Sequence, residues 1–168
     1  IFHSNLRFVS FILELVPEIM LVRLGHGHCH LITAIQYFSL AIIKEFEKIG
    51  LSHDLPLIQA DNGKMLNALQ YSFKIKSTKS FAYFVDMTSK EVALRYLLDM
   101  FGSYSEISRH VLSYGLFPQL DFVAILGRKL GFSLKSKDNP SITDPNVPTI
   151  LLSQEQLDRV HQIMDEGI

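Results

Sequence analysis

The chain has 168 residues, which suits one domain or part of a larger protein and is long enough to bury a sizeable core. Its 16 basic and 17 acidic residues leave a formal net charge of −1, which argues against a broad electrostatic surface for nucleic acid or an anionic membrane. Hydrophobic residues make up 48% of the chain and charged residues only 20%, against an average of about 25% charged, so we expect broadly buried helix faces or an apolar surface left for a neighbour.

The first residues of the chain suggest a piece of a longer protein, from which a targeting signal could have been cut. Residues 1–6 include neither an initiator Met nor a basic signal region, so we expect a fragment of a larger protein. Residues 24–43 are uncharged but open with two glycines and three histidines, whereas a spanning helix needs about 20 predominantly apolar residues. We predict no transmembrane segment. A lone cysteine, Cys29, suits a reducing compartment or a fold that needs no disulfide.

Apolar residues recur at helical spacing along most of the chain, and period-two alternation is nearly absent. This pattern predicts an all-α fold in which each apolar stripe needs a covering partner. Short polar or glycine-bearing stretches at 74–78 and 102–106 separate neighbouring stripes, so the expected order is helix, tight turn, helix, longer loop. The stripes include Leu31, Ala34, Ile35 and Phe38; Ile42, Ile43, Phe46 and Ile49; Met65, Ala68, Leu69 and Phe73; Phe81, Phe84 and Val85; and Ile107, Val111 and Leu112.

One segment of the chain is repeated. Ile32–Tyr37 (ITAIQY) is echoed thirty-four residues later by Leu66–Tyr71 (LNALQY). A period near 34 predicts stacked antiparallel helix pairs, because one pair cannot bury its own apolar face and neighbouring pairs extend a continuous core.

Three segments resemble ankyrin repeats. Gly27–Ala34 (GHCHLITA) matches the first-helix pattern G-x-T-P-L-H-x-A at its glycine, leucine and alanine, although Cys29-His30 replaces the Thr-Pro pair. Ala41–Gly50 and Glu106–Gly115 resemble the second-helix pattern E-I-V-K-x-L-L-x-x-G. The resemblance extends from residue 4 to about 115 and implies a divergent ankyrin-like helical repeat array. An unclassified helical array is the alternative.

The C-terminal part departs from the repeat pattern. We assign residues 1–133 to the array, with Phe117–Leu130 as one more helix. Residues 134–149 are polar, contain three prolines and are expected to form a loop or linker. Ser153–Gln156 (SQEQ) has the form of a capping box. It predicts a terminal capping helix within 150–168, with Leu157, Val160 and Met164 facing inward.

The histidine-rich stretch before Leu31 raises a metal-site hypothesis. In an extended chain His26, His28 and His30 point the same way, and neutral imidazoles suit zinc or copper. Neither Cys-x-x-Cys nor His-Glu-x-x-His accompanies them, so we favour the turn and helix entrance of a repeat, without a cofactor. His53-Asp54 resembles part of the metal set of HD-type phosphohydrolases. A metal-dependent, HD-like hydrolase therefore stays open, with ligands from His26, His28, His30, His53 and Asp54.

We expect a non-catalytic protein–protein interaction module rather than an enzyme. The array resembles those of effector proteins from intracellular bacteria and of some poxvirus proteins, which implies an intracellular location, in the host cytosol if the protein is a secreted effector. The expected partner is another protein and not nucleic acid. A third alternative is a structural brace for a catalytic domain elsewhere in the full chain. In ankyrin arrays the inter-repeat turns and first helices contact the partner, so the candidate contacts are His28, His30, Asp61, Asn62, Lys64 and Gln70.

Overall fold

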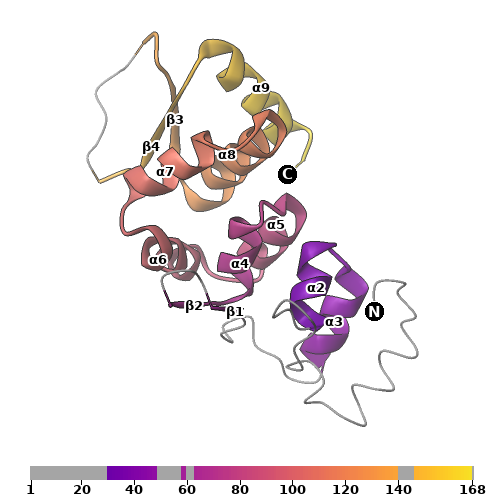
Figure 1. The fold of residues 1–168 in the computed structure, drawn as a ribbon. Helices are drawn as coiled ribbons and strands as arrows, with labels where there is room; N and C mark the ends of the chain where they lie inside the picture. Colours follow the sequence, from indigo (N-terminus) through magenta and orange to yellow (C-terminus); the bar gives the residue numbers. More distant parts are fainter. Residues whose placement is uncertain (1–29, 49–57, 60–62, 140–145, 168) are drawn as a thin grey trace. The chain divides into compact units, whose positions relative to one another are not determined.

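The computed structural model describes residues 30–48, 58–59, 63–139 and 146–167. This part of the chain is mostly helical, which confirms the predicted helical class, and it also contains two small two-stranded sheets (Figure 1). The chain divides into two compact units, Ile1–Phe84 and Val85–Ile168. Within the described ranges, none of the helices is both long and apolar enough to cross a lipid bilayer.

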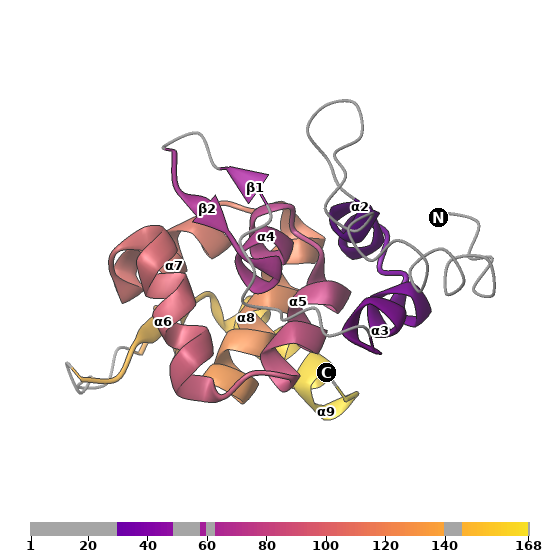
Figure 2. The ribbon, with the colours of Figure 1, turned by 90° about the horizontal axis from the view of Figure 1, so that it is seen from below.

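The first unit contains two helix pairs and a short hairpin. Strands β1 and β2 are antiparallel, with Ile58 opposite Leu66, and the hairpin leads directly into α4 (Figure 2). Helix α2 packs against both α3 and α4. In chain order the elements are α2 (His30–Gln36), α3 (Leu40–Lys48), β1 (Ile58–Gln59), β2 (Met65–Leu66), α4 (Ala68–Lys74) and α5 (Thr78–Asp86).

The two helix pairs share the same turn geometry. After α2, Ser39 N–H donates to the Ala34 carbonyl and Phe38 N–H donates to that of Ile35. The same two bonds recur after α4 at an offset of 38 residues, with Phe38 (φ 47°) matched by Lys76 (φ 60°). Helices α2 and α4 each have 7 residues, and α3 and α5 each have 9. The two pairs therefore match in helix length and in the hydrogen bonds of the turn.

The thirty-four-residue echo is not the structural equivalence. Ile32 lies inside α2, whereas its echo Leu66 lies in β2 and the next residue, Asn67, is the N-cap of α4. The two offsets differ by four residues, about one helical turn. Because such a slip leaves an apolar stripe on the same helix face, periodicity alone does not detect it.

Aromatic and aliphatic side chains fill the core of the first unit. At the 38-residue offset, buried Ile35 is matched by Phe73 and buried Phe46 by Phe84. The Phe73 and Phe81 rings meet edge to face at 5.2 Å. The Ser80 hydroxyl in α5 donates a 2.6 Å hydrogen bond to the Ile35 carbonyl at the end of α2. The Ile35 carbonyl, which also accepts from the Phe38 N–H, thus links the end of α2 to α5.

The second unit combines helices with a parallel strand pair. Serine hydroxyls accept N-cap hydrogen bonds at the start of three of its helices, and Gly131 ends α8 in the left-handed region (φ 76°). Val111 is fully buried, as Ile43 and Phe46 are in the first unit, which confirms their predicted core positions. In chain order the elements are α6 (Lys90–Phe101), α7 (Tyr104–Leu112), α8 (Leu116–Leu130), β3 (Ser133–Ser136), β4 (Thr149–Leu152) and α9 (Gln154–Asp165).

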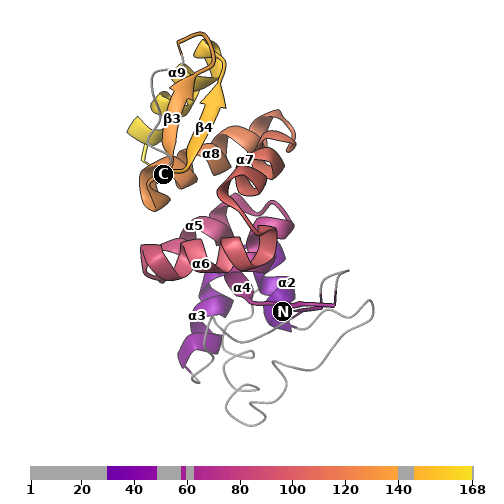
Figure 3. The same cartoon turned by 90° about the vertical axis from the view of Figure 1, so that its left-hand side faces the viewer.

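The loop predicted at 134–149 is wrong at both ends. β3 and β4 pair in parallel, with Ser133 opposite Thr149 and Ser136 opposite Leu152 (Figure 3). Four-residue strands carry too little alternation to stand out in the sequence, and their pairing is non-local. The terminal helix begins after β4, at Gln154, where the predicted capping box places its start. Its predicted capping box is confirmed, because the side chains of Ser153 and Gln156 each accept a hydrogen bond from the other residue's backbone N–H.

Candidate functional site

Only some predicted site residues lie in the described part of the chain. His30 is the first residue of α2, Lys64 is exposed and Gln70 is buried. The remaining predicted contacts and metal ligands, namely His26, His28, His53, Asp54, Asp61 and Asn62, lie outside the described residues. The proposed metal set is therefore not tested by the described residues, and that alternative stays a prediction. Among the residues described, no group of three or more His, Cys, Asp or Glu side chains is placed to hold a metal ion.

The β1–β2 hairpin exposes two side chains of different chemistry. Gly63 adopts φ 84°, which glycine permits at no steric cost. Lys64 follows it on the surface, and Met65 is 44% exposed. The next residue, Leu66, is buried because successive strand residues face opposite sides. The hairpin thus exposes an ammonium group and a flexible thioether at successive positions of the chain.

Gln70 has a structural role that corrects its inclusion among the surface contacts. It is 7% exposed, and its Oε1 accepts a 3.0 Å hydrogen bond from the Asn67 N–H. In return, Asn67 Oδ1 accepts one from the Gln70 N–H, also at 3.0 Å. This is a capping box, which satisfies two backbone donors at the start of α4. The same pattern was recognised in the sequence at Ser153 but missed here, because Asn replaces the usual Ser or Thr.

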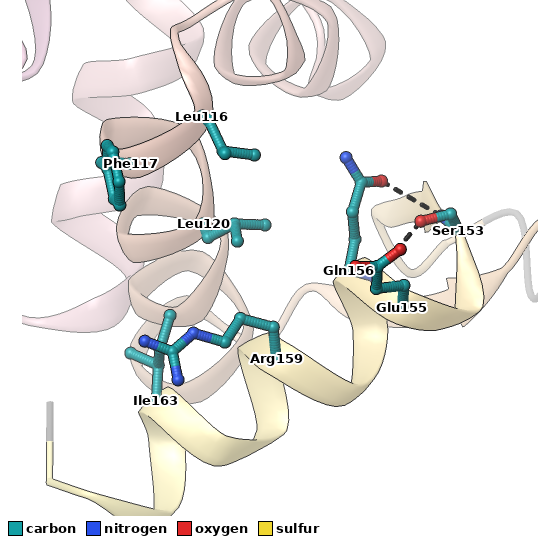
Figure 4. Close-up of a pocket in the computed structure, with 8 residues that line it drawn as sticks. All are labelled: Leu116, Phe117, Leu120, Ser153, Glu155, Gln156, Arg159 and Ile163. Carbon is teal, nitrogen blue, oxygen red and sulfur yellow. Dashed lines mark hydrogen bonds between the residues drawn. The ribbon is translucent and has the colours of Figure 1, made fainter.

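A groove in the second unit lies between α8 and α9. Its volume is about 400 Å³. Figure 4 shows Leu116 and Leu120 pointing from α8 toward α9, and the Arg159 side chain extending from α9 toward α8. The Arg128 guanidinium donates to the Met164 carbonyl and ties α8 to the C-terminal part of α9. The groove is lined by Leu116, Phe117, Leu120, Ser153, Glu155, Gln156, Arg159 and Ile163.

The α8 side of the groove is unusually apolar for a surface. Phe117 is 82% exposed and Leu116 is 63% exposed, next to each other in the first turn of α8. Leu120, one turn further, is largely buried. Exposed apolar side chains that sit together beside a groove mark an interaction surface more often than scattered ones do.

The α9 side contributes charge. Glu155 and Arg159 lie four residues apart, one helical turn, and both are exposed. In the described part of the chain neither forms an ion pair. Arg159 Nη1 instead donates a 2.9 Å hydrogen bond to Oε1 of Gln162. Burial raises the pKa of the Asp121 carboxyl on α8, while the positive charge of Arg159 partly offsets that rise.

A second, more open pocket lies between α7 and β4. It has a volume of about 460 Å³ and is lined mainly by hydroxyl-bearing residues with Leu112 and Leu151. The Ser108 hydroxyl in its wall is buried and has no hydrogen-bond partner among the residues described. Arg109, the charged side chain of the lining, pairs with Glu106 at 2.5 Å. The pocket therefore offers a ligand hydroxyl groups, two leucine side chains and an arginine that already has an acidic partner.

Comparison with known proteins identifies no relative. No protein-family model, curated protein or solved structure matches the chain. Assignment of a site therefore depends on the geometry described above.

Sequence reasoning missed the groove. Leu116 is spaced one turn before Leu120 and so belongs by periodicity to the buried face of α8. It is nevertheless 63% exposed, whereas Leu120 is largely buried. Nothing in the sequence marked Arg159 as a groove residue, because a single arginine on the polar face of an amphipathic helix is common.

Proposed function

We propose that the chain is a non-catalytic protein–protein interaction module that uses ankyrin-like helix pairs in its first unit to bind another protein. One observation carries the proposal. The α4–α5 pair repeats the helix lengths and turn hydrogen bonds of the α2–α3 pair, and a β-hairpin with exposed Lys64 and Met65 precedes it.

The core positions of the two pairs support a repeat. Ile43 and Phe46 in α3 correspond to Phe81 and Phe84 in α5, and all four side chains are buried. Equivalent buried positions on successive helix pairs are what a repeat array needs, since each pair covers its neighbour. The ankyrin resemblance at Gly27–Ala34 and Ala41–Gly50 flanks or overlaps the first of these pairs.

The hairpin supports the choice of contact surface. In ankyrin arrays the turns between repeats contact the partner, and β1–β2 connects the two pairs here. Lys64 supplies a charge that steers a partner with acidic groups, and Met65 supplies an adaptable apolar contact. Gln70 is removed from the proposed contacts because it is buried, whereas Lys64 remains with His28, His30, Asp61 and Asn62.

Site-specific photo-crosslinking tests this function. A photoreactive amino acid replaces Met65, and the matched control replaces Met87, which is 54% exposed and follows α5. We expect a discrete adduct with a different protein at position 65 and none at position 87. Lys64→Glu should reduce the adduct, because reversing a charge at an interface weakens a complementary pairing. Equal labelling at both positions, or an adduct that Lys64→Glu leaves unchanged, would contradict the proposal.

A further inference from the structure

The groove between α8 and α9 carries two opposite charges. Arg159 acts electrostatically on Asp121 of α8 but forms no salt bridge with it in the described part of the chain. Glu155 and Arg159 both line it, one turn apart on the same helix, and neither forms an ion pair in the described part of the chain. Within one α-helix a Glu followed by Arg at the fourth position is a favourable spacing for pairing. Here Arg159 turns toward α8 instead and bonds to Gln162.

This arrangement is self-complementary. A two-fold axis that crosses α9 midway between Glu155 and Arg159 places a second α9 antiparallel to the first. Each Glu155 then faces Arg159 of the other copy, and both charges are paired at once. A two-fold interface requires this property, since the same patch must fit itself with residue i on j and j on i.

The apolar residues of the groove complete the patch. Leu116 and Phe117 line the groove on α8, and Ile163 extends the lining one turn beyond Arg159 on α9. Both α8 residues are more than half exposed. Apolar centres beside paired charges are the composition of a protein interface. A partner of single charge sign would leave either Glu155 or Arg159 unpaired, whereas a second copy pairs both.

We propose that the α8–α9 groove binds the same groove of a second copy of this chain, forming a symmetric dimer through reciprocal Glu155–Arg159 ion pairs over an apolar centre. The surface lies in the second unit and is separate from the β1–β2 hairpin. Self-association through it is thus independent of the partner surface proposed above.

Charge reversal tests the dimer. Sedimentation equilibrium of the full chain compares wild type, Glu155→Arg, Arg159→Glu and the double reversal. Wild type should dimerise, and each single reversal should weaken association at least about tenfold because it sets like charges against each other twice. The double reversal should restore association, because it exchanges the signs of both partners. Asp165→Arg, the same charge change on α9 outside the groove lining, should leave association unchanged.

Three outcomes would overturn the proposal. They are a wild type that stays monomeric up to the highest soluble concentration, single reversals that associate like wild type, and a double reversal that remains as weak as the single ones. Circular dichroism melts of every variant show whether the fold is retained. We expect it to be, because the substituted positions are exposed. The crosslinking experiment at Met65 is an independent test. If the chain is monomeric but still forms a specific adduct at position 65, the dimer is rejected and the proposed interaction function stands.

Discussion

The Tyr83 hydroxyl in α5 donates a 2.6 Å hydrogen bond to Oε1 of Glu47 in α3. This bond joins the second helices of the two equivalent pairs of the first unit. Burial raises the pKa of the Tyr83 phenol, and the hydrogen bond and negative charge of Glu47 raise it further. The phenol therefore stays protonated and can donate its hydrogen bond to the Glu47 carboxylate.

Removing the Tyr83 hydroxyl should destabilise the fold. Tyr83→Phe is expected to lower the free energy of unfolding by about 1–2 kcal/mol, since hydrogen bonds to charged groups contribute somewhat more than neutral ones. Urea unfolding of Tyr83→Phe, Glu47→Gln and the double variant measures the coupling. If the two single effects simply add, the bond contributes nothing to stability.

Phe46 should carry a large share of the core energy. The side chain is fully buried in α3, so Phe46→Ala is expected to cost about 3–5 kcal/mol in unfolding free energy. Phe117→Ala is the matched control, because the same truncation at a side chain that is 82% exposed should change stability by no more than about 0.5 kcal/mol. Both are measured at low protein concentration, where self-association does not contribute. A cost below about 1 kcal/mol at Phe46 would show that its helix face is not core.

Asp121 should make stability depend on pH in the acid range. Its folded pKa is raised by burial, with Arg159 opposing, so the folded state holds the proton more tightly than the unfolded one. The stability that Asp121 contributes is therefore fully present below the ordinary aspartate range and is lost as pH rises through the folded pKa. Asp121→Asn is expected to melt higher than wild type at neutral pH, with the gain shrinking as pH falls.

The same removal of a negative charge at the exposed Asp138 controls for net charge. Melts of Asp121→Asn and Asp138→Asn across this pH range distinguish a local burial effect from a global one. An equal gain in both variants, or a gain for Asp121→Asn that does not vary with pH, would refute the burial effect.

Zinc should not stabilise the protein if residues 25–30 are a repeat entrance. Replacing His26 and His28 with Asn is expected to change stability by no more than about 0.5 kcal/mol each, as surface substitutions do. A bound metal would instead add about 2.7 kcal/mol at a hundredfold excess over its dissociation constant. Thermal melts with zinc and with a chelator decide between them. A zinc-dependent rise that the double variant lacks would favour the metal-dependent hydrolase.

Local sequence signals determined the helices and one cap of this protein. Helical apolar spacing predicted buried Ile43, Phe46 and Val111, all of which are in the core. The SQEQ motif marked the start of α9, because capping uses residues only three positions apart. Such features depend on contacts within about one helical turn, which is the range over which sequence pattern carries direct information.

Tertiary structure alone decided the register, the strands and the groove. The offset of 38 rather than thirty-four residues differs by one helical turn, which apolar periodicity tolerates. β3 finds its partner only across residues 137–148, and strand pairing of that kind depends on long-range contacts. Leu116 has the spacing of a core residue yet lies exposed beside the groove, because burial depends on which element covers a helix face. That choice is made by the packing of α9 against α8, and no local pattern encodes it.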